Sequence, residues 1–104
     1  MANLPEANVR EAILLGIVIS GKKYGRELRD EYKSRAGHEL PLGSLYTTLN
    51  RLEDKGFISS RYGESLHERG GNRRKYFTIT AKGRRALDEA SVMAAAVVAG
   101  VKYA

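Results

Sequence analysis

The chain has 104 residues and a formal net charge of +6 at neutral pH, which suits one small domain and favours an acidic partner. It contains no cysteine, so disulfides, thiolate metal sites and thiol catalysis are excluded. Residues 1–5 have no basic stretch of the kind that opens a signal sequence. The longest uncharged run, residues 90–101, is shorter than the roughly 20 residues of a membrane-spanning helix. We therefore expect a soluble, cytoplasmic protein with no membrane partner.

The first predicted helix begins at residue 9. Asn8 and Glu11 have the spacing of a capping box, in which two side chains satisfy backbone N–H groups at a helix start. The residues that follow, up to residue 19, are apolar around most of the helix. Such a helix is buried on several sides, in the centre of the domain or at a subunit interface. We assign Ile13 and Ile17 to the interface.

The second predicted helix starts near Tyr24. Apolar or aromatic residues recur at every fourth position from Tyr24 to Ala36, and Gly37 is the expected C-terminal cap. The outer face of this helix is charged, and Lys22 and Lys23 stand at its start. One face is therefore expected to pack on the core while the other meets solvent.

The third predicted helix runs from Leu42 to Lys55 and ends at Gly56. Its residues 42, 45, 49 and 52 are all leucine and form an apolar stripe. The opposite side holds small or polar residues, namely Gly43, Thr47, Asn50, Arg51 and Asp54, flanked by Ser44 and Tyr46. Because Asn can pair with adenine, Arg with guanine and a Thr methyl with a thymine methyl, this face suits a DNA groove. The alternative is an ordinary solvated face, which any soluble helix has.

A hairpin is predicted next, with strands at residues 57–62 and 73–80. Phe77 and Ile79 alternate with threonines, as in a half-buried strand. Residues 69–85 include seven basic residues and no acidic one. The basic residues at the loop end of the hairpin are Arg69, Arg73, Arg74 and Lys75. They suit phosphate contact or minor-groove insertion, and simple solubility is the alternative.

The last predicted helix runs from residue 81 to near the C-terminus, with Thr80 as its cap. Residues 90–101 are apolar or small on every side, and the rest of so small a domain cannot cover them. We therefore predict a homodimer. The predicted interface consists of Ile13, Ile17, Leu87, Ala90, Met93, Ala94, Val97 and Val101. An effector would be a small apolar molecule between the first and last helices, where Met93 is the most adaptable side chain.

Together the elements predict a mainly helical α+β fold, with a winged helix-turn-helix over residues 1–80 and a dimerisation helix over residues 81–104. This combination favours a regulator that binds double-stranded DNA. The alternative is a winged-helix module for protein or RNA contact without sequence-specific DNA binding.

Nothing in the sequence favours an enzyme. His38 and His67 are isolated in polar segments, and the chain has no glycine-rich phosphate loop, HExxH motif or nucleophile elbow. We expect no metal site and no cofactor.

Five motifs in series resemble the PadR family of transcriptional regulators. They are YGREL at 24–28, LGSLY at 42–46 with Leu49, Leu52 and Glu53 after it, GFI at 56–58, RKYF at 74–77 and TAKGRRAL at 80–87. The chain ends after one helix, as in the short subfamily. It has no tryptophan, so the binding of flat aromatic drugs between tryptophans, a property of some short members, is not expected here.

The resemblance implies a homodimeric repressor that reads an inverted repeat. It places Gly43, Ser44, Tyr46 and Thr47 in or beside the major groove and the Arg73-Arg74 tip at the minor groove. It also places Lys22 and Tyr24 against the phosphate backbone. Combined with the residue patterns, the predicted DNA-binding residues are Lys22, Tyr24, Gly43, Ser44, Tyr46, Thr47, Asn50, Arg51, Arg69, Arg73, Arg74 and Lys75.

Overall fold

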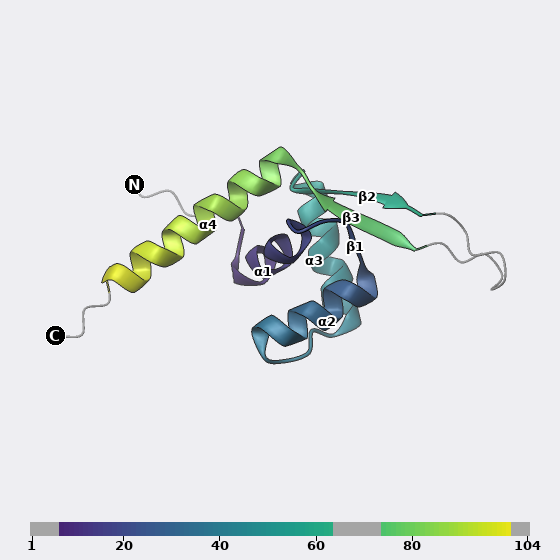
Figure 1. Ribbon diagram of the computed structural model, residues 1–104, viewed down its shortest axis with the longest axis horizontal. Helices are drawn as coiled ribbons and strands as arrows, with labels where there is room; N and C mark the ends of the chain where they lie inside the picture. The colour runs from purple at the N-terminus through teal and green to yellow at the C-terminus, as the bar shows by residue number, and fades with distance from the viewer. Residues whose placement is uncertain (1–6, 64–73, 101–104) are drawn as a thin grey trace.

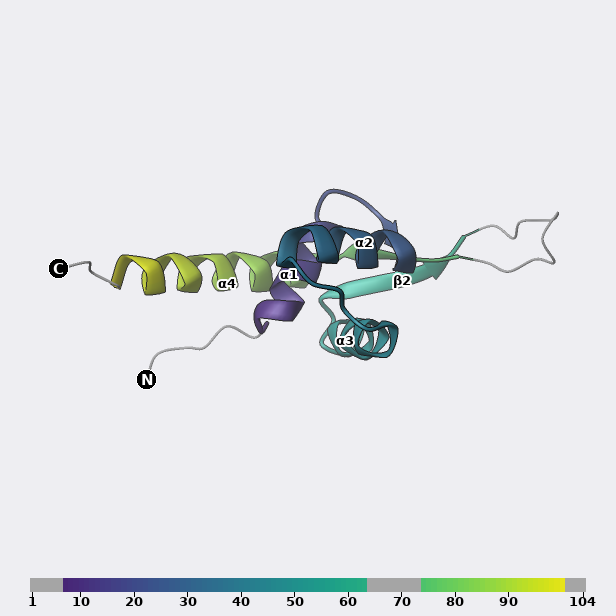
Figure 2. The same ribbon diagram turned by 90° about the horizontal axis from the view of Figure 1, so that it is seen from below.

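The computed structural model describes residues 7–63 and 74–100, with the backbone alone for residues 97–100. Its elements in chain order are α1 (Val9–Val18), β1 (Lys23–Tyr24), α2 (Gly25–Ala36), α3 (Leu42–Asp54), β2 (Ile58–Tyr62), β3 (Lys75–Ile79) and α4 (Ala81–Gly100). The β2–β3 hairpin and α4 extend in opposite directions from a body built of α1, α2 and α3 (Figures 1 and 2). This is the predicted mainly helical α+β fold, a winged helix-turn-helix followed by a long helix.

The predicted helix ends are confirmed by their capping contacts. At α1 the Glu11 N–H donates to Asn8 Oδ1 at 2.8 Å, and the Asn8 N–H donates to Glu11 Oε1 at 3.0 Å. Gly37 ends α2 with φ 80°, a left-handed conformation that glycine adopts without steric cost. At α4 the Gly83 N–H donates to Thr80 Oγ1 at 3.0 Å. Each cap depends on residues within a few positions of one another, which is why the sequence reveals it.

The sheet is antiparallel with strand order β1-β3-β2. In the hairpin, Ile58 pairs with Ile79 and Tyr62 with Lys75. β1 pairs Lys23 with Phe77 and Tyr24 with Tyr76. The sequence did not predict β1, because a strand of two residues is too short to show alternation. Its pairing brings the start of α2 beside β3, next to the loop end of the hairpin.

The core lies between the helices and the inner face of the sheet. Phe57 and Phe77 are fully buried there among leucines of α1, α2 and α3. Ile17 is also fully buried in this core, so its assignment to a subunit interface was wrong. A helix at the centre of a small domain is buried on several sides by its own chain, and here α1 contacts α2, α3, β3 and α4.

The apolar stripe of α3 begins later than predicted. Leu42 is 52% exposed, whereas Leu45, Leu49 and Leu52 are fully buried. Leu42 is the first residue of the helix and lies beyond the part that packs on the core. Thr48 is buried beside the leucines, and its Oγ1 donates to the Ser44 carbonyl at 2.7 Å.

The long helix α4 leaves the body after its first turns. Ala86 is buried and Leu87 half-buried against the core. Further along, Val92 is 70% exposed and residues 94–96 are exposed alanines. The side chain of Val97 and the whole of Val101, both predicted at the interface, lie outside the described residues. No helix within the described ranges is long and apolar enough to cross a membrane.

Candidate nucleic-acid interface

The exposed face of α3 presents the residues that the sequence predicts for base contact. Thr47, Asn50 and Arg51 are exposed, together with Gly43 and the ring of Tyr46, while Ser44 is half-buried. The start of α3 follows Pro41, and no side chain among the described residues caps it. The first N–H groups of the helix are therefore available to an acceptor such as a phosphate.

Tyr46 packs directly on the start of α2. A Cβ on Gly25 would overlap the Tyr46 hydroxyl and lie 3.2 Å from Cζ of the ring. Gly25 is buried and is the first residue of α2. Any larger residue at this position would displace the Tyr46 side chain from its present place. Gly25 belongs to the YGREL motif, but the sequence alone indicates no role for it.

The loop end of the hairpin holds a cluster of aromatic and basic side chains around Tyr24. The Arg74 guanidinium lies 4.5 Å from the centre of the Tyr24 ring, and the Tyr76 ring meets Tyr24 edge-on at 5.7 Å. Lys22 Nζ lies 5.0 Å from the centre of the Tyr76 ring. Cation–π contacts of this kind hold a charged group in place while leaving it able to meet an anion. We call Lys22, Tyr24, Arg74 and Tyr76 the wing-base cluster.

The wing-base cluster joins residues predicted separately. Lys22 and Tyr24 were expected at the phosphate backbone and Arg74 at the wing, and the structure places all three together. Tyr76 was missed, since its partner across the sheet belongs to the unpredicted strand β1. Lys75 lies on the other face of the hairpin, with Nζ 5.8 Å from the centre of the Tyr62 ring. Arg69 and Arg73 lie outside the described residues.

Polar contacts close the hairpin and join β2 to α3. The Gly63 N–H donates to the Arg74 carbonyl at 2.7 Å, which closes the described part of the hairpin. Ser60 Oγ donates to Glu53 Oε2 at 2.6 Å and so ties β2 to the last turn of α3. The orientation of the hairpin relative to the exposed face of α3 is thereby fixed.

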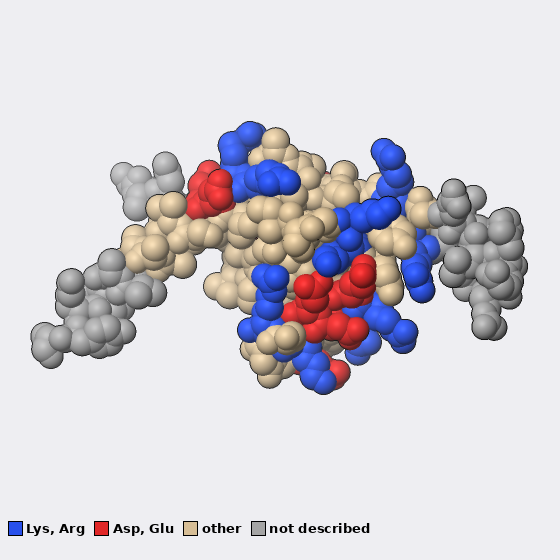
Figure 3. Space-filling view, viewed as in Figure 1, with Lys and Arg blue, Asp and Glu red and all other residues tan. Residues whose placement is uncertain are grey.

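Charge is unevenly distributed over the molecule. Figure 3 shows Lys and Arg side chains near the loop end of the hairpin, at the start of α4 and around a group of Asp and Glu side chains that lies over α2. One of these acidic residues, Glu31, forms an ion pair with Lys23 at 3.3 Å. Within the part of the chain that the structure describes, no group of three or more His, Cys, Asp or Glu residues could hold a metal ion.

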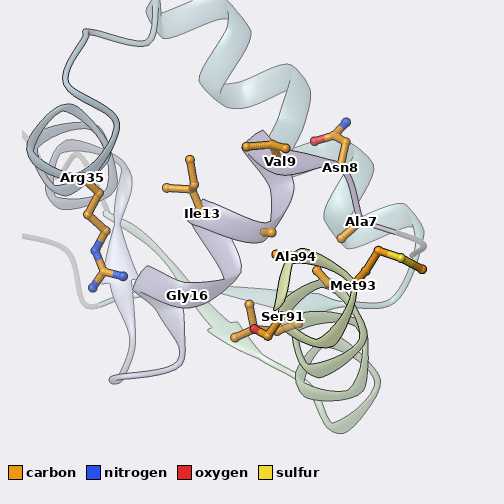
Figure 4. A pocket seen from close by; sticks show the side chains of 12 residues that line it. Ala7, Asn8, Val9, Ile13, Gly16, Arg35, Ser91, Met93 and Ala94 are labelled. Carbon is orange, nitrogen blue, oxygen red and sulfur yellow. The ribbon is translucent and has the colours of Figure 1, made fainter. Parts of the chain in front are cut away.

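A second surface feature is an apolar groove between α1 and α4, with a volume of about 490 Å³. Of the predicted interface residues, five line it: Ile13, Leu87, Ala90, Met93 and Ala94. Figure 4 shows these two helices as its walls. Among the described residues that line the groove, Arg35 supplies the only charged side chain. The groove therefore suits apolar occupants.

Comparison with known proteins decides the family. The model of the transcriptional regulator PadR-like family matches residues 14–89, which run from α1 through the hairpin into α4. The chain belongs to the PadR-like family of transcriptional regulators. An uncharacterized protein of Lysinibacillus sphaericus is 31% identical over 81 residues, which are 76% of this chain and 72% of that protein.

Solved PadR structures share the fold. A PadR-like transcription factor of Bacteroides fragilis superposes with a TM-score of 0.76 at 25% identity, covering 88% of this chain and 84% of that one. Bacillus subtilis PadR, solved in complex with operator DNA, superposes with a TM-score of 0.69 at 24% identity and covers 79% of this chain and 46% of that one. At that identity the second likeness concerns the fold alone. Of the α4 residues that line the groove in this PadR-like chain, Leu87 lies within the matched family region, and Ala90, Ser91, Met93 and Ala94 lie beyond it.

Proposed function

We propose that this PadR-like protein is a homodimeric repressor that reads an inverted repeat with α3 and grips the flanking DNA with its hairpin. The observation that carries the proposal is the placement of the exposed polar face of α3 beside the wing-base cluster. A related fold, that of Bacillus subtilis PadR, has been solved with operator DNA, which supports the assignment. The proposal includes a cytoplasmic location and no enzymatic activity.

In this proposal α3 enters the major groove. Thr47, Asn50 and Arg51 project from the exposed face and contact base edges. Gly43, Ser44 and Tyr46 stand at the uncapped start of the helix, where backbone N–H groups donate to a phosphate. The α3 residues thereby divide into those that read sequence and those that fix the position of the helix.

The hairpin supplies sequence-independent affinity. Arg74 is held on Tyr24 and Lys22 on Tyr76, so little side-chain freedom is lost when either contacts a phosphate. Lys75 adds a charge on the opposite face of the hairpin. We assign Arg69 and Arg73 to the same role at the minor groove.

The groove between α1 and α4 supports the homodimer. Val9, which lines the groove, and Val92 of α4 are both exposed, and such apolar side chains are covered when a second copy packs along α1 and α4. We assign Ile13, Leu87, Ala90, Met93 and Ala94 to this interface, with Val97 and Val101 further along the chain. Two recognition helices that read one face of DNA lie roughly 34 Å apart, and the packing of α1 and α4 sets that distance.

An effector would act at the same interface. The groove is lined by apolar side chains of α1 and α4 and by the adaptable thioether of Met93, so it accepts a small apolar molecule. Such a ligand changes operator affinity only when it binds two dimer geometries with different affinity. We propose that it lowers operator affinity.

Selection of preferred duplexes from a random pool tests the proposed function. A homodimer that reads both half-sites selects an inverted repeat with half-site centres about one helical turn apart. A winged helix that serves as a protein- or RNA-binding module enriches no symmetric sequence. Enrichment of unrelated sequences would contradict the proposal.

Substitutions should separate affinity from specificity. Arg74→Ala is expected to weaken binding to all duplexes alike and to lower the salt dependence by about one unit per lost phosphate contact. Asn50→Ala is expected to relax preference at one base pair by about 1–3 kcal/mol. Binding titrations at several salt concentrations on selected and single-mismatch duplexes measure both effects.

Arg10→Ala is the matched control for charge. Arg10 is exposed on α1 and so belongs neither to α3 nor to the hairpin. It should leave base preference unchanged and alter the salt dependence less than Arg74→Ala. A change of base preference in Arg74→Ala, with none in Asn50→Ala, would reverse the assigned roles of hairpin and helix.

A further inference from the structure

The ion pair between Glu11 and Lys55 joins two parts of the molecule that the proposed function treats separately. Glu11 lies in α1 and is 1% exposed. Lys55 Nζ donates to both of its carboxylate oxygens, at 2.9 Å to Oε1 and 3.1 Å to Oε2. The same Oε1 also accepts the N–H of Asn8 at 3.0 Å. One buried carboxylate therefore connects the first residue before α1 with the residue that ends α3.

Each end of this connection borders a proposed functional surface. Lys55 is the C-cap of α3, and its N–H donates to the carbonyl of Arg51, a proposed base-reading residue, at 2.9 Å. Asn8 lines the groove together with its neighbours Ala7 and Val9. Figure 4 shows these three residues where the chain enters α1. The carboxylate thus lies between the groove and the recognition helix.

The burial of the Glu11 carboxylate makes separation of the Glu11–Lys55 ion pair unfavourable. A carboxylate removed from water keeps its charge at low cost only while its partners stay in place, and removal of one partner is strongly unfavourable. Lys55 is 38% exposed, so the ammonium can regain water while the Glu11 carboxylate cannot. A displacement at the start of α1 therefore either draws the end of α3 with it or breaks the pair.

We propose that Glu11 is a positioning residue for operator binding, which sets the end of α3 relative to α1 and makes operator affinity depend on what occupies the groove. The inference rests on the proposed DNA-binding function and names the internal contact through which the groove acts. Glu11 itself is buried and is therefore not proposed to contact DNA.

Glu11→Gln tests the positioning role. The substitution keeps the size of the side chain and an oxygen that accepts the Asn8 N–H, but it removes the charge that holds Lys55. It raises the net charge of the protein by one, so electrostatics alone would tighten DNA binding. If Glu11 positions α3, DNA binding should instead become weaker. The Kd for the selected inverted repeat is expected to rise at least about fivefold, while the protein remains a folded dimer.

Two control variants separate this effect from charge and from stability. Glu89→Gln makes the same change of charge on the exposed surface of α4 and should bind the operator as tightly as the parent or more tightly. Ile17→Val removes one methylene from the core, which lowers the Tm without touching the ion pair. It should leave the Kd unchanged at a temperature well below the Tm.

A double-mutant cycle with the groove residue Met93 tests the coupling. Met93→Ala enlarges the groove and is expected to change operator Kd in the parent, and this change should largely disappear in the Glu11→Gln background. The inference is overturned when Glu11→Gln binds no more weakly than Glu89→Gln, when Ile17→Val weakens binding equally, or when the effects of Glu11→Gln and Met93→Ala simply add. A parent protein that prefers no inverted repeat would instead contradict the proposed function.

Discussion

Ala94→Asp is expected to convert the dimer into folded monomers and to reduce operator affinity more than any substitution on α3. Ala94 is exposed on α4 and lines the groove, so a single chain accommodates aspartate in solvent. In the proposed dimer the same carboxylate is buried without a partner, which costs several kcal/mol. Loss of the dimer removes one of two half-site contacts. Light scattering at micromolar concentration, together with operator titration, measures both consequences.

Ala81→Asp provides the matched control. It makes the same chemical change at the exposed first residue of α4, where an acidic side chain is favourable to the helix, and it lies away from the groove. The control should remain dimeric. If Ala94→Asp remained a dimer of unchanged operator affinity, the groove between α1 and α4 would not be the subunit interface.

Gly25→Ala is expected to weaken operator binding sharply while leaving the fold intact. The added methyl group overlaps the hydroxyl of Tyr46, so either the tyrosine or the start of α3 shifts. Overpacking of this kind costs about 1–3 kcal/mol. Alanine favours a helix over glycine by up to about 1 kcal/mol, which offsets part of the loss in stability but none of the displacement at the DNA-facing surface. Operator titration and thermal unfolding report the two effects separately.

Tyr46→Phe tests whether overlap with the Tyr46 hydroxyl causes the weaker operator binding of Gly25→Ala. It removes the atom that meets the new methyl group and leaves the ring, whose Cζ lies 3.2 Å from the added Cβ. In the Tyr46→Phe background Gly25→Ala should therefore change operator Kd much less than in the parent. An equal loss in both backgrounds would show that the close approach of Tyr46 is not the reason for glycine at this position.

The features of the fold that could be predicted from the sequence are those whose determining contacts are local. The Asn8–Glu11 box, the left-handed Gly37 and the Thr80 cap each depend on residues at most three or four positions apart. The hairpin was also predictable, since alternation around Phe77 indicates which face is buried. The exposed face of α3 followed from helical periodicity alone.

The remaining features depend on contacts between distant parts of the chain. Strand β1 exists because Tyr24 pairs with Tyr76, and two residues show no pattern by themselves. Apolarity marked Ile17 as buried but could not show whether its own chain or a partner covers it. The contact between Glu11 and Lys55 spans 44 positions, so the sequence revealed the capping role of Glu11 and not its second partner.

The measurement that tests the central claim most directly is a stoichiometric titration of the selected inverted repeat, compared with a duplex in which one half-site is scrambled. We expect two protomers per intact duplex and a loss of affinity on scrambling that grows with each mismatched base pair by about 1–3 kcal/mol. Asn50→Ala should reduce this discrimination. Binding of a single protomer, or equal affinity for the intact and scrambled duplexes, would contradict a homodimer that reads both half-sites with α3.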